Sequence, residues 1–240
     1  MQRISVVAVE AHPDDVEMHC MGTLLLLRQQ NAKITIISVS NGDKGAAHQP
    51  KRQYGRIART RMEEAAAAAE MLGAEFVSLG AEDGYIEATP ALLNDLTAAI
   101  RNGSADVVLA PNPDDYHLDH IVTSQLAFQA SYYAALPQLP IDGACLSASP
   151  RLWYYDSTCG VDFQPETYVD VSSVIEEKRA LARLHASQME NMRRIGGWDL
   201  VEHIEIVGRF RGLQSGVQYA EAFSSCRRFP RNHALSVLPL

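Results

Sequence analysis

The chain has 240 residues, 47% of them hydrophobic, and a formal net charge of -8 at pH 7. This length and composition suit one α/β domain with a sizeable core and exclude a disordered protein. The negative charge argues against general nucleic-acid binding, and because no run of 18 apolar residues occurs, we expect no membrane-spanning segment.

The start of the chain and its cysteines indicate a cytoplasmic protein. Residues 1–4 lead directly into a predicted strand and lack the pattern of a secretory signal. Cys20, Cys145, Cys159 and Cys226 are scattered and form no Cys-x-x-Cys pair. That spacing favours reduced thiols over a disulfide framework or a zinc knuckle.

A strand predicted for 4–9 ends in the polar motif His12-Pro13-Asp14-Asp15. The proline cannot continue a strand, so the chain turns there, and either aspartate can cap the helix predicted for 16–30. His19 lies on the same face of that helix as Asp15, but packing is a more common role than metal binding for such a residue. Ligands of open α/β sheets bind at the carboxyl ends of the strands. Alone, the motif is equally compatible with an ordinary helix cap.

Further strands and helices alternate along the chain, which predicts βαβ units and a parallel sheet. We expect strands over 33–39, 74–79, 105–110, 151–155 and 167–171, and a last extended piece over 216–223. We expect helices over 59–72, 90–101, 121–134, 172–188 and 200–212, the second with Pro90 at its first position. No internal repeat or linker divides the chain, so we predict one domain over residues 1–240.

The segment 44–61 contains six basic residues and no acidic one. Such a segment is most often a solvated loop. The functional alternative is a mobile loop that attracts an anionic or polar substrate.

The strand predicted for 105–110 repeats the opening design. It ends in a proline-rich turn, and the motif His117-Leu118-Asp119-His120 follows. Because strand carboxyl ends share one edge of a parallel sheet, both motifs can meet there. Two imidazoles and a carboxylate form a familiar zinc set that leaves a position open for water. A further carboxylate can act as general base, and a further histidine can stabilise an oxyanion or protonate a leaving amine. These are the parts of a metal-assisted amide hydrolase.

Both motifs resemble those of the PIG-L/LmbE-like family of zinc-dependent N-deacetylases, which act on N-acetylglucosaminyl compounds. The resemblance implies the following roles: zinc binding by His12, Asp15 and His120, general base catalysis by Asp14, stabilisation of the tetrahedral intermediate by His117, and orientation of a histidine by Asp119. Arg61, in Arg61-Met62-Glu63-Glu64-Ala65, matches a family motif whose arginine reaches the substrate.

The resemblance extends to later segments. Residues 178–188, with His185-Ala186-Ser187-Gln188, are similar to the family's late helix, and 205–223 are similar to the bacillithiol-pathway deacetylase branch. Val16 departs from the pattern, because many members have glutamate directly after the second aspartate. The segments 42–59 and 137–150 match no family pattern, so the substrate does not follow from the resemblance.

We therefore expect a single α/β domain with a mainly parallel, Rossmann-like sheet flanked by helices. Its expected activity is removal of an N-acetyl group from an amino-sugar small molecule, with zinc, iron or another divalent metal as cofactor. The alternatives are an amidase of a thiol conjugate, a hydratase of an unsaturated carboxylic acid, and a binding protein without activity. No Gly-x-Gly-x-x-Gly follows the first strand, so no dinucleotide is predicted. The resemblance also implies a homo-oligomer.

Overall fold

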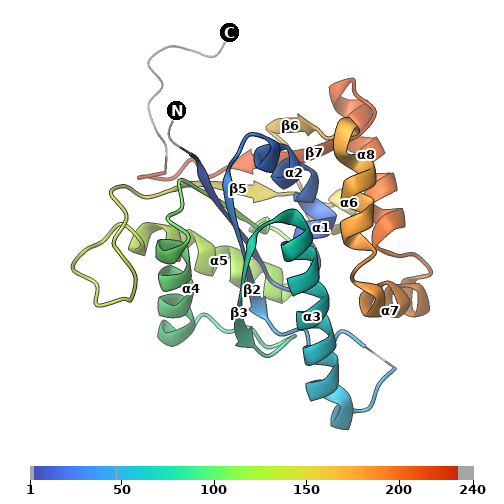
Figure 1. Cartoon of the computed structure of the whole chain (residues 1–240), viewed down its shortest axis with the longest axis horizontal. Coiled ribbons are helices and arrows are strands. Elements are labelled where there is room, and N and C mark those ends of the chain that lie inside the picture. Colours follow the sequence, from blue (N-terminus) through green and yellow to red (C-terminus); the bar gives the residue numbers. More distant parts are fainter. Residues whose placement is uncertain (1–2, 47, 232–240) are drawn as a thin grey trace.

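A seven-stranded sheet lies between two layers of helices in the computed structural model, which describes residues 3–46 and 48–231 (Figure 1). The strands are β1 (Ser5–Glu10), β2 (Lys33–Ser40), β3 (Glu75–Ala81), β4 (Val107–Ala110), β5 (Arg151–Tyr155), β6 (Thr167–Asp170) and β7 (Ala220–Ser225). The helices are α1 (Asp15–His19), α2 (Met21–Gln29), α3 (Tyr54–Leu72), α4 (Pro90–Asn102), α5 (Leu118–Tyr133), α6 (Ile175–Ala182), α7 (Ala186–Gly196) and α8 (Leu200–Ser215).

The strand order is β3-β2-β1-β4-β5-β7-β6. Neighbours from β3 to β5 pair in parallel, whereas β7 is antiparallel to both β5 and β6. The predicted mainly parallel α/β fold is confirmed. The chain builds outward from β1 to β3 on one side and then from β4 on the other. The topological switch point therefore lies between β1 and β4, where open sheets bind their ligands.

The central strand β1 is buried on both faces, as its run of valine and alanine predicts. Val7 and Val9 pack in a core with α4 and α5. Val6 and Ala8 pack in the opposite core, with α1, α2, α3, α6 and α8. The two layers are visible on either side of the sheet in Figure 1.

The helix predicted for 16–30 is two helices, separated at Cys20, whose φ of -141° is not helical. The cap prediction is also wrong. Asp14 makes no side-chain capping bond, and the N–H of Val16 donates instead to Oε2 of Glu10 (3.2 Å). Oδ2 of Asp15 accepts from backbone N–H groups before the helix, those of Ala11 and His12. Glu10, at the end of β1, thus caps α1.

Two other helices differ from their predicted bounds. α3 begins at Tyr54, after a 3-10 turn over Lys51–Gln53, so much of the basic segment is helical rather than looped. The segment 172–188, predicted as a single helix, forms a 3-10 turn, then α6 and the start of α7. The helix is interrupted because α6 ends at Ala182 and α7 begins at Ala186. α4 begins as predicted, with the N–H of Leu92 donating to Oγ1 of Thr89.

The last strand, β7, ties the first helices to the rest of the molecule. Glu221 on β7 is buried, and its carboxylate accepts from the N–H groups of Gly22 and Thr23, both at 2.7 Å. Nζ of Lys178 also donates to Glu221 (2.6 Å) and to the carbonyl of Met18 (2.9 Å). The described chain contains no helix that is long and apolar enough to cross a membrane.

Candidate active site

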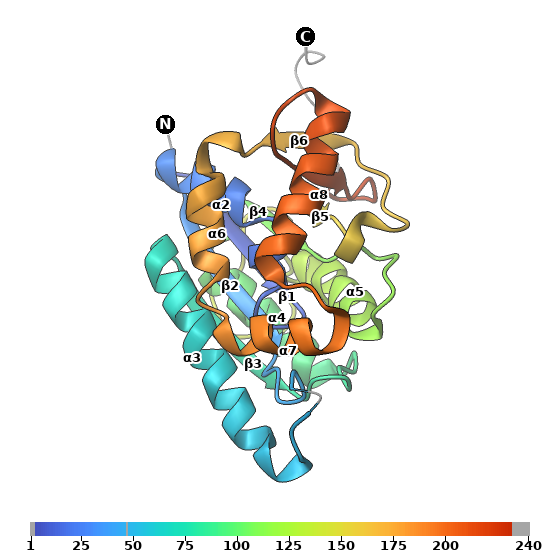
Figure 2. The same ribbon diagram turned by 90° about the vertical axis from the view of Figure 1, so that its right-hand side faces the viewer.

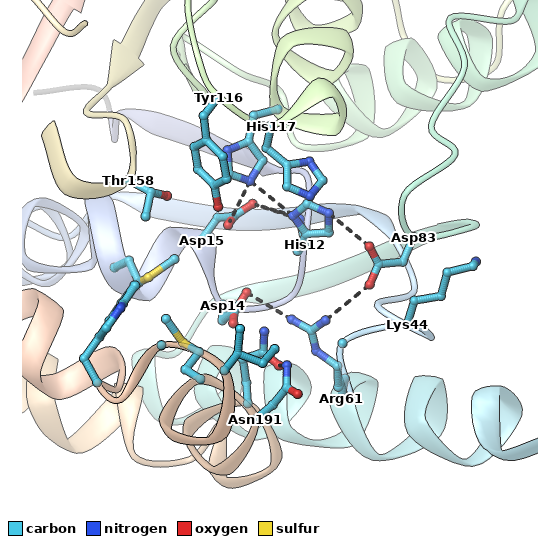
Figure 3. A pocket seen from close by; sticks show the side chains of 18 residues that line it. His12, Asp14, Asp15, Lys44, Arg61, Asp83, Tyr116, His117, Thr158 and Asn191 are labelled. Carbon is cyan, nitrogen blue, oxygen red and sulfur yellow. Dashed lines mark hydrogen bonds and ion pairs between the residues drawn. The ribbon is translucent and has the colours of Figure 1, made fainter. Parts of the chain in front are cut away.

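A cavity of about 440 Å³ opens at the carboxyl edge of the sheet, beside the switch point. Both predicted motifs reach it, and Figure 3 shows their side chains converging from the loops after β1 and β4. The lining residues fall into three groups: His12, Asp14, Asp15, Tyr116, His117 and His120 from the motif loops, Lys44, Gly45, Arg61 and Asp83 on one flank, and Met18, Thr158, Gln188, Asn191, Met192, Ile195, Gly196 and Trp198 elsewhere on the wall.

His12, Asp15 and His120 are buried, and their ligand atoms lie close enough together to hold a metal ion. Nδ1 of His12 is 3.2 Å from Nε2 of His120, and that nitrogen is 3.4 Å from Oδ1 of Asp15. Nδ1 of His12 is 3.6 Å from Oδ2 of Asp15. Ligand atoms around a tetrahedral zinc ion lie about 3.3 Å apart, since zinc–nitrogen distances are about 2.0 Å. The three residues therefore fit a zinc-sized cation.

The charges around these ligands also favour a cation. Burial lowers the pKa of His12, but the carboxylates of Asp119 and Asp15 outweigh burial and raise that pKa well above its usual value. Burial likewise lowers the pKa of His120, and Asp15 and Asp115 raise it to about 9. The carboxylates thus stabilise positive charge at this point of the cavity, and a divalent metal would supply it.

Asp14 lies beside this group and is held by Arg61. Nη2 of Arg61 donates to Oδ1 of Asp14 (3.1 Å) and to the carbonyl of Pro13 (3.0 Å). Burial raises the pKa of Asp14 to about 6, and the charge of Arg61 limits the rise. Asp14 also has a φ of 146°, a strained conformation for a residue with a side chain. A fixed carboxylate with a pKa near neutrality suits a general base.

His117 is the N-cap residue of α5, and Asp119 lies in the first turn of that helix. Nδ1 of His117 accepts from the N–H of Asp119 (3.2 Å), so in the neutral ring Nε2 carries the proton. Burial and the neighbouring histidines lower the pKa of His117, which favours the neutral ring. Oδ2 of Asp119 accepts from the N–H of Gly84 (2.6 Å) and lies 3.3 Å from Nε2 of His12. Asp119 is thus placed to orient His12.

Asp83 is a site residue that the sequence analysis missed. Its Oδ1 lies 3.3 Å from Nε2 of His12, and its Oδ2 lies 3.6 Å from Nη1 of Arg61 (Figure 3). In the sequence, Asp83 stands before Gly84 in an ordinary turn. The available signal was its place after β3, because that strand ends at the same edge of the sheet.

Arg61 is almost fully buried, with 2% of its surface exposed. Besides Asp14, it donates to the carbonyl of Gly42 (3.3 Å), and a Cβ on Gly42 would lie 2.7 Å from Nη1 of Arg61. The predicted contact of Arg61 with substrate stays a prediction. The structure places its guanidinium in the cavity wall, between the carboxylates of Asp14 and Asp83.

The remaining lysines and arginines of 44–61 bring little unpaired positive charge to the cavity. Lys44 lines the cavity, but its Nζ pairs with Asp43 (3.3 Å) and Glu82 (2.7 Å). Lys51, Arg52, Arg56 and Arg59 are exposed and do not line it. His19, the possible extra ligand, is buried and stacks on Tyr155 at 5.5 Å. It belongs to neither potential metal-binding group of the described chain; these are His12 with Asp15 and His120, and His12 with His117 and Asp119.

The wall formed by α7 was also missed. Figure 2 shows α7 beside α3 and the lower end of α8. The start of α7 is fixed to α3 by Glu64, which accepts from the N–H (2.9 Å) and Oγ (2.6 Å) of Ser187. Glu64 stands in the predicted Arg-x-Glu-Glu motif, so this pairing links two segments that the sequence analysis treated separately.

Comparisons with known proteins show what the chain is similar to. The family model for PIG-L, described as GlcNAc-PI de-N-acetylase, matches residues 7–131. A diacetylchitobiose deacetylase of Thermococcus kodakarensis is 26% identical over 90% of this chain and 80% of its own. A 4-oxalmesaconate hydratase of Pseudomonas putida is 27% identical over 95% of this chain and 90% of its own.

A solved structure shares the fold. The N,N'-diacetylchitobiose deacetylase of Pyrococcus horikoshii superposes with a TM-score of 0.79, at 23% identity, over 92% of this chain and 83% of that one. The matched family region contains both histidine motifs and ends within α5. The chain therefore belongs to the PIG-L/LmbE-like deacetylase family.

Proposed function

We propose that this protein is a zinc-dependent hydrolase that removes the N-acetyl group from an N-acetylglucosaminyl-type small molecule. The observation that carries the proposal is the buried group His12, Asp15 and His120, with Asp14 and His117 beside it in one cavity. Membership of a deacetylase family supports the reaction type. Activity as an enzyme on small molecules is the common property of the named relatives.

Zinc held by His12, Asp15 and His120 would polarise the amide carbonyl and make the attacking water more acidic. In our proposal Asp14 takes the proton of that water as it attacks. Arg61 holds the Asp14 carboxylate in place, and Asp83 holds the other side of the guanidinium. Iron or another divalent metal could fill the same role.

His117 stabilises the developing oxyanion through the proton on Nε2, because its Nδ1 already accepts from the backbone. The tetrahedral intermediate then collapses, the C–N bond breaks, and the proton on Asp14 goes to the leaving amine. Asp119 keeps His12 in its ligating orientation from the other side of the ring. The products are acetate and a free amino sugar.

A hydratase of an unsaturated carboxylic acid is the second candidate, because one relative is a hydratase. The charges favour the deacetylase. The lysine and the arginine that line the cavity in the described chain, Lys44 and Arg61, are already paired with carboxylates. A substrate with several carboxylates would need unpaired cations, whereas a neutral amino sugar does not.

The deciding experiment measures acetate release from a panel of neutral and anionic N-acetylglucosaminyl compounds, with and without a chelator. We expect acetate from neutral members, lost with the chelator and restored by zinc. The same preparation is tested for water addition to unsaturated dicarboxylic acids. No acetate from any compound, together with water addition, would replace the deacetylase by the hydratase. Release of another acid from a thiol conjugate would indicate the amidase, and no metal and no turnover would indicate a binding protein.

Other expectations stay proposals. They are a single deacetylase domain over residues 1–240, a cytoplasmic location and a homo-oligomeric assembly. Membership of the bacillithiol-pathway branch, suggested by 205–223, is also a proposal, since the relatives named above are chitobiose deacetylases and a hydratase.

A further inference from the structure

The lining of the cavity is chemically divided. The loops after β2 and β3, with α3, contribute Lys44, Asp83 and Arg61, which are charged. A second part of the lining comes from Met18 of α1, from α7 and from the α7–α8 connection, and its polar members are Gln188 and Asn191. Its apolar members are Met18, Met192, Ile195 and Trp198. Tyr116 adds a largely exposed aromatic ring from the loop after β4.

Two apolar residues of this wall are accessible at the cavity. Ile195 is 66% exposed although it lines the cavity, and Met192 is half-buried. Their partner Trp198 is held in place. Its indole stacks on His203, with ring centroids 5.6 Å apart, and lies so close to α7 that a Cβ on Gly196 would be 2.7 Å from its Nε1. A rigid aromatic ring beside exposed aliphatic side chains is a surface suited to an apolar ligand group.

We propose that Met192, Ile195 and Trp198 form a subsite for an apolar aglycone of the substrate. This inference rests on the proposed function and names the substrate class more narrowly, as an N-acetylglucosaminide with an apolar group on its anomeric oxygen. The apolar wall belongs to the same cavity as Asp14 and the proposed metal-binding group, so one ligand can fill both parts.

The volume of the cavity also favours a substrate larger than an acetamido sugar. A volume of about 440 Å³ is within the range of cavities that hold drug-sized ligands. An acetamido sugar alone leaves part of such a cavity to water. An apolar aglycone would displace this water from Ile195 and Trp198, and would gain affinity in proportion to the apolar area buried.

The test compares the hexyl and methyl β-glycosides of N-acetylglucosamine, with diacetylchitobiose as a polar glycoside. Dissociation constants are measured by calorimetry on the zinc-loaded Asp14→Asn variant, which is not expected to consume the ligands. Values of kcat/KM are measured on the wild type. We expect the hexyl glycoside to be preferred over the methyl glycoside by about tenfold in both measurements.

Ile195→Ser should reduce this hexyl-to-methyl ratio by about threefold. Ile206→Ser is the matched control, because Ile206 is 61% exposed on α8 and does not line the cavity. It should leave the ratio unchanged. A ratio near one in the wild type, a ratio equal in the two variants, or stronger preference for diacetylchitobiose than for the hexyl glycoside would overturn the subsite.

The design separates this inference from the proposed function. Acetate release from all glycosides without a hexyl preference would leave the deacetylase standing and remove the subsite. Tight, Ile195-dependent binding of the hexyl glycoside without acetate release from any compound would support the subsite and remove the deacetylase.

Discussion

The two sides of the cavity are built in different ways. On one side, His12, Asp14 and Asp119 are buried and held by ion pairs: His12 contacts Asp119 and Asp83, and Asp14 is held by Arg61. The side formed by α7 has exposed apolar residues; Glu64 holds its start, and the ion pair of Arg193 with Asp199 holds its end. Chemistry at a metal needs fixed atoms, whereas recognition of a substrate substituent tolerates variation. We therefore expect variants of the buried side to lower kcat or stability, and variants of the α7 side to change substrate binding.

The largest effect is expected for Asp14→Asn. Without a base, kcat should fall by about 10²- to 10⁴-fold for every substrate, while zinc content and KM change little. Steady-state kinetics and elemental analysis measure this. The control is Asp142→Asn, an exposed aspartate in the segment 137–150. Turnover within a fewfold of wild type would remove Asp14 from the mechanism.

Arg61→Gln tests whether the buried side depends on its ion pairs. The change leaves Asp14 and Asp83 without their cation, and loss of one partner of a buried pair costs about 3 kcal/mol of unfolding free energy. Urea unfolding measures the loss. Arg59→Gln, at an exposed position of α3, is the control. If both variants unfold at the same urea concentration, Arg61 does not hold the site together.

His203→Gln tests whether the buried histidine that stacks on Trp198 makes the stability of the protein depend on pH. Burial and the charge of Lys178 lower the pKa of His203 from 6.5 to about 4, and its Nε2 accepts from the N–H of Cys159. Between these pH values the unfolded chain binds a proton that the folded protein does not, so stability is present above pH 6.5 and lost as the pH falls. From pH 7 to pH 5 this loss is about 2 kcal/mol.

Glutamine preserves an acceptor for Cys159 but does not titrate. The pH dependence of the unfolding free energy should therefore be about 2 kcal/mol smaller in His203→Gln than in the wild type. His48→Gln, at an exposed position, serves as the control. Parallel curves for the wild type and His203→Gln would contradict the prediction.

The smallest effect is expected for Glu64→Ala, which removes both bonds to Ser187. Each neutral or charge-assisted bond contributes about 1 kcal/mol, so the start of α7 should loosen and KM should rise about three- to tenfold with little change in kcat. Glu63→Ala, one position earlier and exposed, should behave as wild type. An equal fall in kcat would place Glu64 with the catalytic residues instead.

Part of the buried side of the cavity could be predicted from the sequence, whereas the side formed by α7 could not. His12, Asp15 and His120 stand out because polar residues directly follow buried apolar strands, and parallel strands end at one edge. Glu10 was missed as the cap because it ends β1 and stands five residues before the helix, away from the usual N-cap position. Asp83 was missed because the turn around Gly84 has no special pattern.

The α7 wall could not be predicted, because its position depends on packing rather than on local pattern. Gln188 was assigned to a helix continuous with the preceding one, but α7 begins anew at Ala186. What fixes that start is the contact of Ser187 with Glu64, on a helix far earlier in the chain. A tertiary contact of this kind leaves no periodic signal.

The position of β7 has a consequence for how the protein is made. In the sequence, the proposed metal ligands His12 and Asp15 precede Glu221 by about 200 residues, so they leave the ribosome well before it. Glu221, which accepts from the N–H groups of Gly22 and Thr23, is synthesised only when β7 is translated. A nascent chain therefore carries its metal-binding side chains long before the strand that secures their helices exists. The hydrogen bonds that fix the start of α2 therefore form only when β7 has joined the antiparallel end of the sheet.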